Sequence, residues 1–214
     1  MTGASRAIWF FPSFASSYSY FAAQRIEDVA ARHGRAVLWR PVMLRRLLAA
    51  QHGGTVPDRS TQWIEYQMRD VVRIAAARGL PFAMPNRFPP DSEATYAIVY
   101  GLAGSDEERL RSLTLAVLQA VWASGKPVRD AAEVGDALAR YLMGRTEVEL
   151  AARDPAGVAA ADAALDLARR SGMCGAPWMV VDGETFWGQD RLPALDHWLG
   201  GRPRLAAVDK PIAD

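Results

Sequence analysis

The chain has 214 residues, of which 50% are hydrophobic and 23% are charged, and 25 Lys and Arg against 24 Asp and Glu give a formal net charge of +1. This composition is typical of one large or two small globular domains and excludes a disordered chain. The charge balance argues against a nucleic-acid partner, because affinity for phosphate backbones comes mainly from a surplus of Lys and Arg.

The cysteine and histidine content excludes several kinds of site. Cys174 is the one cysteine, so an intrachain disulfide, a cysteine-rich zinc site and a CxxC redox pair are excluded. The three histidines lack the spacing of a metal-binding motif, so we expect no metal. We expect Cys174 to be a small buried residue rather than a reactive thiol.

Neither a signal peptide nor a membrane span is expected. Pro12, Ser13, Ser16 and Ser17 interrupt the apolar stretch near the N-terminus, which is unlike a secretory leader. No apolar run approaches the roughly 20 residues that cross a bilayer. The sequence therefore predicts a cytoplasmic protein without a membrane partner.

The N-terminal segment predicts a strand, a helix and a second strand. Residues 6–11 are apolar and aromatic, which is typical of a buried strand. Apolar residues then recur at helical spacing over 17–33, and Gly34 follows as a helix stop. Residues 36–40 predict the second strand, and the helical crossover implies that it runs parallel to the first.

The middle of the chain reads as helical. Amphipathic patterns over 64–75, 110–121 and 134–142 predict three helices, and residues 79–90 contain the prolines and glycine of a loop between the first two. No repeat period is visible.

The C-terminal segment predicts a helix, a hairpin and a last helix. A helical stripe runs over 158–168, and strands over 178–181 and 184–187 are joined by an Asp-Gly turn, a strong hairpin signal. A helix over 189–199 completes the order.

This order predicts an α/β, thioredoxin-like fold with a large all-helical insertion. The thioredoxin-like domain is expected at residues 1–58 and 156–214, and the inserted helical domain at residues 59–155.

Three turns are candidate sites. Hydroxyl residues crowd positions 16–20 at the start of the first helix, where Ser16 fits either an N-cap or an anion-binding group. Pro177 either opens a strand in an ordinary turn or, as is typical of the thioredoxin arrangement, follows a cis bond and exposes the backbone of Ala176 to an extended ligand. Asp190, next to Gln189, fits a helix start or a ligand-binding turn.

Two motifs resemble a known family. The stretch FASSYSY at 14–20 is similar to F-x-S-P-Y-S-Y, and GAPWMVVDG at 175–183 with FWGQDR at 186–191 is similar to G-V-P-x-x-V-V-D-G and F-x-G-Q-D-R. These signatures belong to the 2-hydroxychromene-2-carboxylate isomerases and kappa-class glutathione transferases, within the DsbA-like thioredoxin group. The likeness spans nearly the whole chain.

The resemblance implies a glutathione-dependent isomerase acting on a small aromatic or electrophilic substrate, in a protein that is commonly a homodimer. It implies that the catalytic Ser16 hydroxyl contacts the glutathione sulfur. The other implied glutathione-binding residues are Tyr18, Ala176, Pro177, Gln189 and Asp190. The implied chemistry is reversible addition of the thiolate, bond rotation and expulsion of the sulfur.

The sequence departs from the family pattern at Ser17, where proline is usual, at Gly53 and Gly54, and at Asp91, where asparagine is usual. The lost amide and added carboxylate suggest a substrate other than the reference chromene. The alternatives are a kappa-type transferase or peroxidase and a non-catalytic binding protein of the same fold. A disulfide oxidoreductase is disfavoured because Ser16 cannot form a mixed disulfide.

Overall fold

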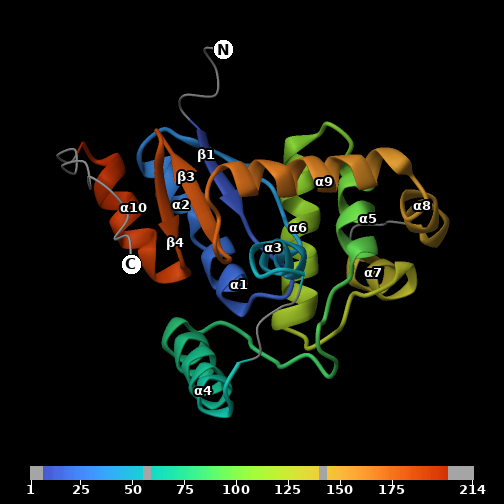
Figure 1. The fold of residues 1–214 in the computed structure, drawn as a ribbon, viewed down its shortest axis with the longest axis horizontal. Helices are drawn as coiled ribbons and strands as arrows, with labels where there is room; N and C mark the ends of the chain where they lie inside the picture. The colour runs from blue at the N-terminus through green and yellow to red at the C-terminus, as the bar shows by residue number, and fades with distance from the viewer. Residues whose placement is uncertain (1–6, 55–58, 140–143, 202–214) are drawn as a thin grey trace.

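The computed structural model describes residues 7–54, 59–139 and 144–201. Its sheet has four strands in the order β2-β1-β3-β4 (Figure 1). β1 runs parallel to β2 and antiparallel to β3, and β3 is antiparallel to β4. The strands are Ala7–Phe11 (β1), Ala36–Trp39 (β2), Trp178–Val181 (β3) and Glu184–Trp187 (β4). The predicted parallel pairing of the first two strands and the predicted hairpin are therefore confirmed.

The local sequence explains both the pairing of β1 with β2 and the hairpin of β3 and β4. Phe10 is fully buried, and its ring packs edge-on against Trp39 with centroids 4.8 Å apart. In the hairpin turn, Asp182 and Gly183 have φ values of 52° and 84°, which is the left-handed backbone that a two-residue primed turn requires.

The single helix predicted over 17–33 is wrong: the structure has α1 (Ser17–Ala23) and α2 (Ile26–Arg32). The chain breaks at Arg25, whose φ of −134° is not helical and whose N–H bonds to the carbonyl of Ala22. Both sides of the break are buried, so the apolar pattern continues across it and hides it from a periodicity argument.

The predicted helices at 64–75, 110–121, 158–168 and 189–199 are confirmed as α4 (Thr61–Arg78), α6 (Glu107–Trp122), α9 (Pro155–Arg170) and η3 (Gln189–Arg191) with α10 (Leu192–Leu199). The helix predicted at 134–142 corresponds to α7 (Ala131–Leu138), and its last residues, including Tyr141 and Leu142, lie outside the described residues. The remaining described helices are α3 (Leu44–Gln51), α5 (Glu93–Ala103) and α8 (Arg145–Ala151).

Helices α5 and α8 were not predicted from the periodicity. Nearly every side of α5 is buried, so its sequence has no polar face to mark a helical period. Its start is fixed by a capping box between Ser92 and Thr95, in which the Ser92 N–H donates to Thr95 Oγ1 at 3.1 Å.

The sheet and its helices α1, α2 and α10 form one side of the molecule, and α5 to α8 form the other, with α9 bridging them (Figure 1). Helix α9 packs closely on α5 because Gly157 has no side chain: a Cβ there would lie 2.3 Å from the carbonyl oxygen of Ala97. One buried apolar cluster runs through both sides. Helix α4 extends away from this body and approaches α1.

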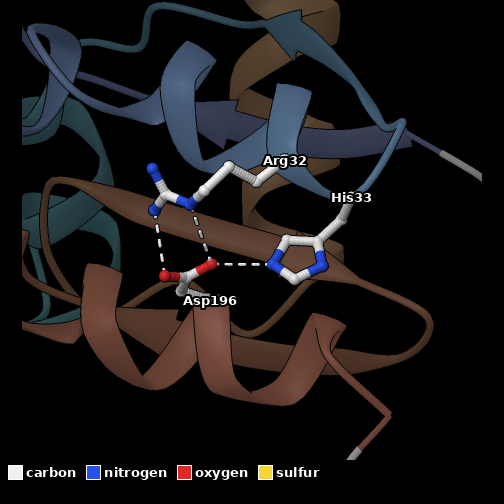
Figure 2. A network of polar contacts seen from close by, with 3 residues as sticks. All are labelled: Arg32, His33 and Asp196. Carbon is white, nitrogen blue, oxygen red and sulfur yellow. Dashed lines mark hydrogen bonds and ion pairs between the residues drawn. The ribbon is translucent and has the colours of Figure 1, made fainter.

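A polar clamp joins the last helix to α2. Asp196 of α10 accepts hydrogen bonds from the Arg32 guanidinium at 2.9 Å and the His33 ring at 2.7 Å (Figure 2). These two partners, Arg32 foremost, lower the pKa of Asp196. Among the described residues, none of the helices is both long and apolar enough to cross a membrane.

Candidate active site

Ser16 lies at the N-cap of α1, directly after β1, in extended backbone conformation. Its Oγ accepts a hydrogen bond from the Ser19 N–H at 3.2 Å, which satisfies one free donor of the first helical turn. The residue is 8% exposed. The capping role considered for Ser16 is therefore real.

The same hydroxyl also reaches the second predicted turn. Ser16 Oγ donates to the carbonyl oxygen of Ala176 at 3.1 Å, and the Ala176–Pro177 peptide bond is cis. Gly175, which precedes this bond, packs against Trp187 of β4: a Cβ at Gly175 would lie 2.4 Å from the indole nitrogen of Trp187. Residues 160 positions apart thus meet at one point, as the thioredoxin order predicted.

Tyr18 lies one residue into α1 and its hydroxyl donates to Asp70 Oδ2 of α4 at 2.8 Å. Burial, followed by the hydrogen bond and the charge of Asp70, raises the pKa of Tyr18 far above its ordinary value. The carboxylate of Asp190 contributes to this shift, so Asp190 and Tyr18 are electrostatic neighbours. Tyr18 is consequently a hydrogen-bond donor, and not a base, near neutral pH.

Gln189 begins η3 and is buried, and its Oε1 accepts a hydrogen bond from Arg78 Nη2. Arg78 stands in the last turn of α4. Helix α4 therefore contacts the turn that contains Gln189 and Asp190, the third candidate site predicted from the sequence. Gly188 has φ of 108°, a conformation that favours glycine, and the side chain of Asp190 folds back over it. Neither Arg78 nor Asp70 was predicted, because no local pattern links Asp70 to Tyr18, 52 positions away, or Arg78 to Gln189, 111 positions away.

The structure brings most of the predicted residues into one region, although at different distances from Ser16. Ser16 contacts Ala176 directly, whereas Tyr18 and Gln189 are joined to the same region through α4. Gly53 and Gly54 lie in the exposed turn after α3 with positive φ values, and no contact of theirs to Ser16 is seen in the described residues.

A second polar cluster, here called the buried triad, lies beneath the Ser16 turn and was missed. It consists of Asp91, Tyr96 and Ser13. The Tyr96 hydroxyl donates to Asp91 Oδ2 at 2.6 Å, accepts the Phe14 N–H at 3.1 Å and lies 3.1 Å from Ser13 Oγ. Asp91 Oδ1 is buried without a hydrogen-bond partner among the described residues.

Burial raises the pKa of the Asp91 carboxyl, against the opposing effect of the Tyr96 hydrogen bond. Desolvation likewise raises the pKa of Tyr96. The sequence had singled out Asp91 as a departure from the family pattern, but nothing in the local sequence pointed to Tyr96 as its partner.

Cys174 is exposed, so the expectation of a buried cysteine is wrong. It lies in the loop between α9 and β3, where the preceding Met173 is fully buried and occupies the core position. Partial desolvation raises the pKa of the Cys174 thiol, which leaves it a weak nucleophile near neutral pH.

A cavity of about 130 Å³ lies between α3, α5 and α9, away from Ser16. Arg46 in its wall is neutralised by Asp162, with Nη1 and Oδ1 2.6 Å apart. Tyr96 also lines the cavity, so the buried triad separates this space from the Ser16 turn.

Comparison with known proteins agrees with this architecture. The chain is 29% identical over 206 residues to the 2-hydroxychromene-2-carboxylate isomerase of Sphingobium xenophagum, covering 91% of this chain and 98% of that protein. It is 25% identical over 194 residues to the protein of the same name from Pseudomonas putida, covering 89% and 93% of the two chains.

A solved structure of 2-hydroxychromene-2-carboxylate isomerase has the same fold, with a TM-score of 0.76 at 24% identity, covering 91% of this chain and 94% of that one. Residues 7–200 match the family described as the DSBA-like thioredoxin domain. The sheet order and the cis-proline turn opposite the start of α1 are in keeping with this match. The chain therefore belongs to the DsbA-like thioredoxin domain family, and the fold predicted for it is confirmed.

Proposed function

We propose that the protein is a glutathione-dependent isomerase resembling 2-hydroxychromene-2-carboxylate isomerase and acting on a small aromatic compound. The observation that carries the proposal is the contact between the Ser16 hydroxyl and the Ala176 carbonyl, 3.1 Å apart. The names of the two curated relatives support the reaction type. A cytoplasmic location fits, because the cytosol maintains a glutathione pool.

The groups at this turn fit an extended peptide that carries a thiol. An ordinary thiol with a pKa near 8.5 is only about 3% ionised at pH 7, and lowering that pKa by two units ionises roughly three quarters of it. When bound, glutathione supplies the thiol that adds reversibly to the substrate double bond. The protein needs no cysteine of its own for this chemistry, and Ser16 stands where a thioredoxin-like oxidoreductase would need one.

Ser16 can serve the fold and the ligand at once. A serine hydroxyl has one hydrogen to donate and two lone pairs that accept. The cap uses an acceptor site, whereas the contact to Ala176 uses the hydrogen. A ligand backbone N–H that took over the Ala176 carbonyl would release the Ser16 hydrogen to stabilise a sulfur anion, leaving the cap intact.

Calorimetric titration with glutathione, followed by assays on two substrates, tests the proposal. We expect binding at micromolar to millimolar glutathione, and isomerisation of a hydroxychromene carboxylate or a related aromatic acid only when glutathione is present. S-methylglutathione is the matched control, because it retains the peptide and cannot form a thiolate.

Two outcomes contradict the proposal. Failure to bind millimolar glutathione would assign a non-catalytic binding role. Glutathione-dependent turnover of a general electrophile, without isomerase activity on any aromatic acid of the panel, would assign the transferase alternative.

A further inference from the structure

We propose that the cavity between α3, α5 and α9 is a second binding site of the protein and that it takes an aromatic amine with a single ring. The cavity measures about 130 Å³. Its walls come mainly from these three helices, and within the described chain no residue of the Ser16, Ala176 or Gln189 turns contributes to them. The inference is therefore independent of the proposed function.

The cavity forms where α9 and α5 diverge from their closest approach. Helix α9 runs across α5 (Figure 1), and the two touch at Gly157, where a Cβ would lie 2.3 Å from the carbonyl oxygen of Ala97. Ala161 and Leu165 follow Gly157 on the same face of α9 at helical spacing, and both line the cavity. Crossed helices separate with distance from their crossing point, so this face changes from a tight contact into a cavity wall. Met43, at the N-cap of α3, lines the cavity from the third helix.

The volume and the lining of the cavity select a ligand with one ring. The lining residues that carry no charge are apolar or aromatic, and they include Met43, Tyr96 and Leu165. An apolar cavity of about 150 Å³ binds benzene, so the space here suits one six-membered ring. Pockets for drug-sized ligands occupy about 300–1,000 Å³, so a tripeptide such as glutathione is too large to be enclosed.

The charges at the mouth of the cavity select an amine over an acid. Arg46 Nη1 lies 2.6 Å from Asp162 Oδ1, whereas Arg46 Nε lies 3.8 Å from Glu93 Oε1. Arg46 therefore neutralises Asp162, and the Glu93 side chain, which is 69% exposed, is only weakly paired. A ligand ammonium can pair with Glu93 without breaking the contact between Arg46 and Asp162. A ligand carboxylate would be repelled, because one cation cannot neutralise both carboxylates.

Methyl NMR of the full chain, with benzylamine, benzyl alcohol and benzoate as probes, tests the inference. Benzylamine should shift the Met43 methyl signal, which is identified by its absence in Met43→Leu. We expect a Kd of about 0.1–1 mM, which is within reach of a ligand with so few non-hydrogen atoms. Benzyl alcohol has the same ring without the charge and should bind about 2- to 5-fold more weakly, because an exposed ion pair contributes little. Benzoate should bind more weakly than either.

Two pairs of variants separate the contribution of the ring from that of the charge. Ala161→Leu fills the cavity and should remove the Met43 shift for every probe, whereas Ala163→Leu, at an exposed position of the same helix, should leave binding unchanged. Glu93→Gln should reduce the affinity for benzylamine to that for benzyl alcohol, and Glu65→Gln, at an exposed position of α4, should not. Circular dichroism checks that each variant is folded.

An unchanged Kd for benzylamine in the presence of saturating glutathione would support a site separate from the Ser16 turn, and competition between the two would overturn it. Absence of a Met43 shift at millimolar benzylamine, or equal binding by Ala161→Leu and the natural protein, would show that the cavity is not the site. Equal affinity for benzylamine and benzoate would overturn the assignment to an amine.

Discussion

Two polar clusters lie on either side of the turn formed by residues 13–16, and they are built differently. In the Ser16–Ala176 contact, here called the rim of the turn, the hydroxyl hydrogen is donated to a backbone carbonyl, and Ser16 and Ala176 are 8% and 9% exposed. In the buried triad, the hydroxyl of Tyr96 is 2.6 Å from Asp91 and also holds the backbone of Phe14. Both clusters tie the same turn to distant parts of the chain.

The difference concerns which hydrogen bonds a ligand can exchange. At Ser16, a ligand N–H can replace the hydroxyl on the carbonyl, and the free energy of the exchange is small because each group keeps a partner. Beneath the turn, Asp91 is 2% exposed, and losing a partner there costs the full desolvation of a buried polar group. We infer that the Ser16–Ala176 contact takes part in ligand binding and catalysis, whereas the buried triad holds the turn rigid.

The largest expected effect comes from removing the rim hydroxyl. Ser16→Ala should lower glutathione-dependent turnover by about 10²- to 10³-fold, the scale for loss of one preorganised donor to a developing anion. Its loss of stability should be only about 1 kcal/mol, the typical cost of an N-cap. Steady-state kinetics and urea denaturation measure the two effects.

Ser60→Ala is the matched control for Ser16→Ala, because Ser60 caps α4 through the same kind of bond to the Trp63 N–H at 3.2 Å. It should cost comparable stability with unchanged turnover. Equal turnover in Ser16→Ala and the natural protein would reduce Ser16 to its capping role and remove the distinction between the clusters.

The second effect falls on stability. Tyr96→Phe removes the hydroxyl that serves Asp91 and the Phe14 N–H, so it should lower the free energy of unfolding by about 1–3 kcal/mol. Urea denaturation measures this loss. Tyr66→Phe, at an exposed tyrosine of α4, is the control and should change stability by less than about 0.5 kcal/mol. A loss no larger than the control's would mean that the buried triad does not support the turn.

The two clusters also differ in how far sequence could predict them. The Ser16–Ala176 contact follows from the order of the elements, because a thioredoxin-like topology places the end of β1 opposite the start of β3. The hairpin follows from a local rule, since Asp182 and Gly183 tolerate the backbone that the turn needs. The hairpin is thus predictable from neighbouring residues, and the Ser16–Ala176 contact is predictable from a known topology.

The buried triad and the Arg78–Gln189 contact could not be predicted in this way. Ser13 and Tyr96 are 83 positions apart, and Arg78 and Gln189 are 111 apart, so no local pattern connects them. Helix α5, which carries Tyr96, was itself missed because burial on nearly all sides removes its amphipathic signal. Pairings of this kind depend on how the inserted helices pack, which the sequence pattern does not encode locally.

A third effect is a dependence of stability on pH. Burial raises the pKa of Asp91 above its ordinary value of 3.8, so between the two pKa values the folded protein holds a proton that the unfolded chain has released. The free energy of unfolding must then fall as pH rises through this window, by at most about 1.4 kcal/mol per pH unit. Asp91→Asn, which is neutral at every pH, should lack this contribution.

Urea denaturation of the natural protein and of Asp91→Asn from pH 4.5 to 8 measures this pH dependence. The stability of the variant relative to the natural protein should increase with pH. Asp130→Asn is the control, because Asp130 is an exposed N-cap and asparagine caps equally well. Parallel pH curves for the natural protein and Asp91→Asn would show that Asp91 does not hold a proton in the fold.

The smallest effect distinguishes Ser16 from its neighbour Tyr18 on the rim. The pKa of Tyr18 is raised mainly by burial and then by Asp70, so its hydroxyl stays protonated near neutral pH and donates to that carboxylate. Tyr18→Phe should therefore weaken glutathione binding by only about 5-fold, the value of one net hydrogen bond, without altering the pH dependence of turnover below pH 9. Calorimetry and a pH–rate profile measure both quantities. If Tyr18 instead moved a proton during turnover, its loss would lower the rate as much as Ser16→Ala does and would change the pH profile, and the reaction would then depend on two rim hydroxyls.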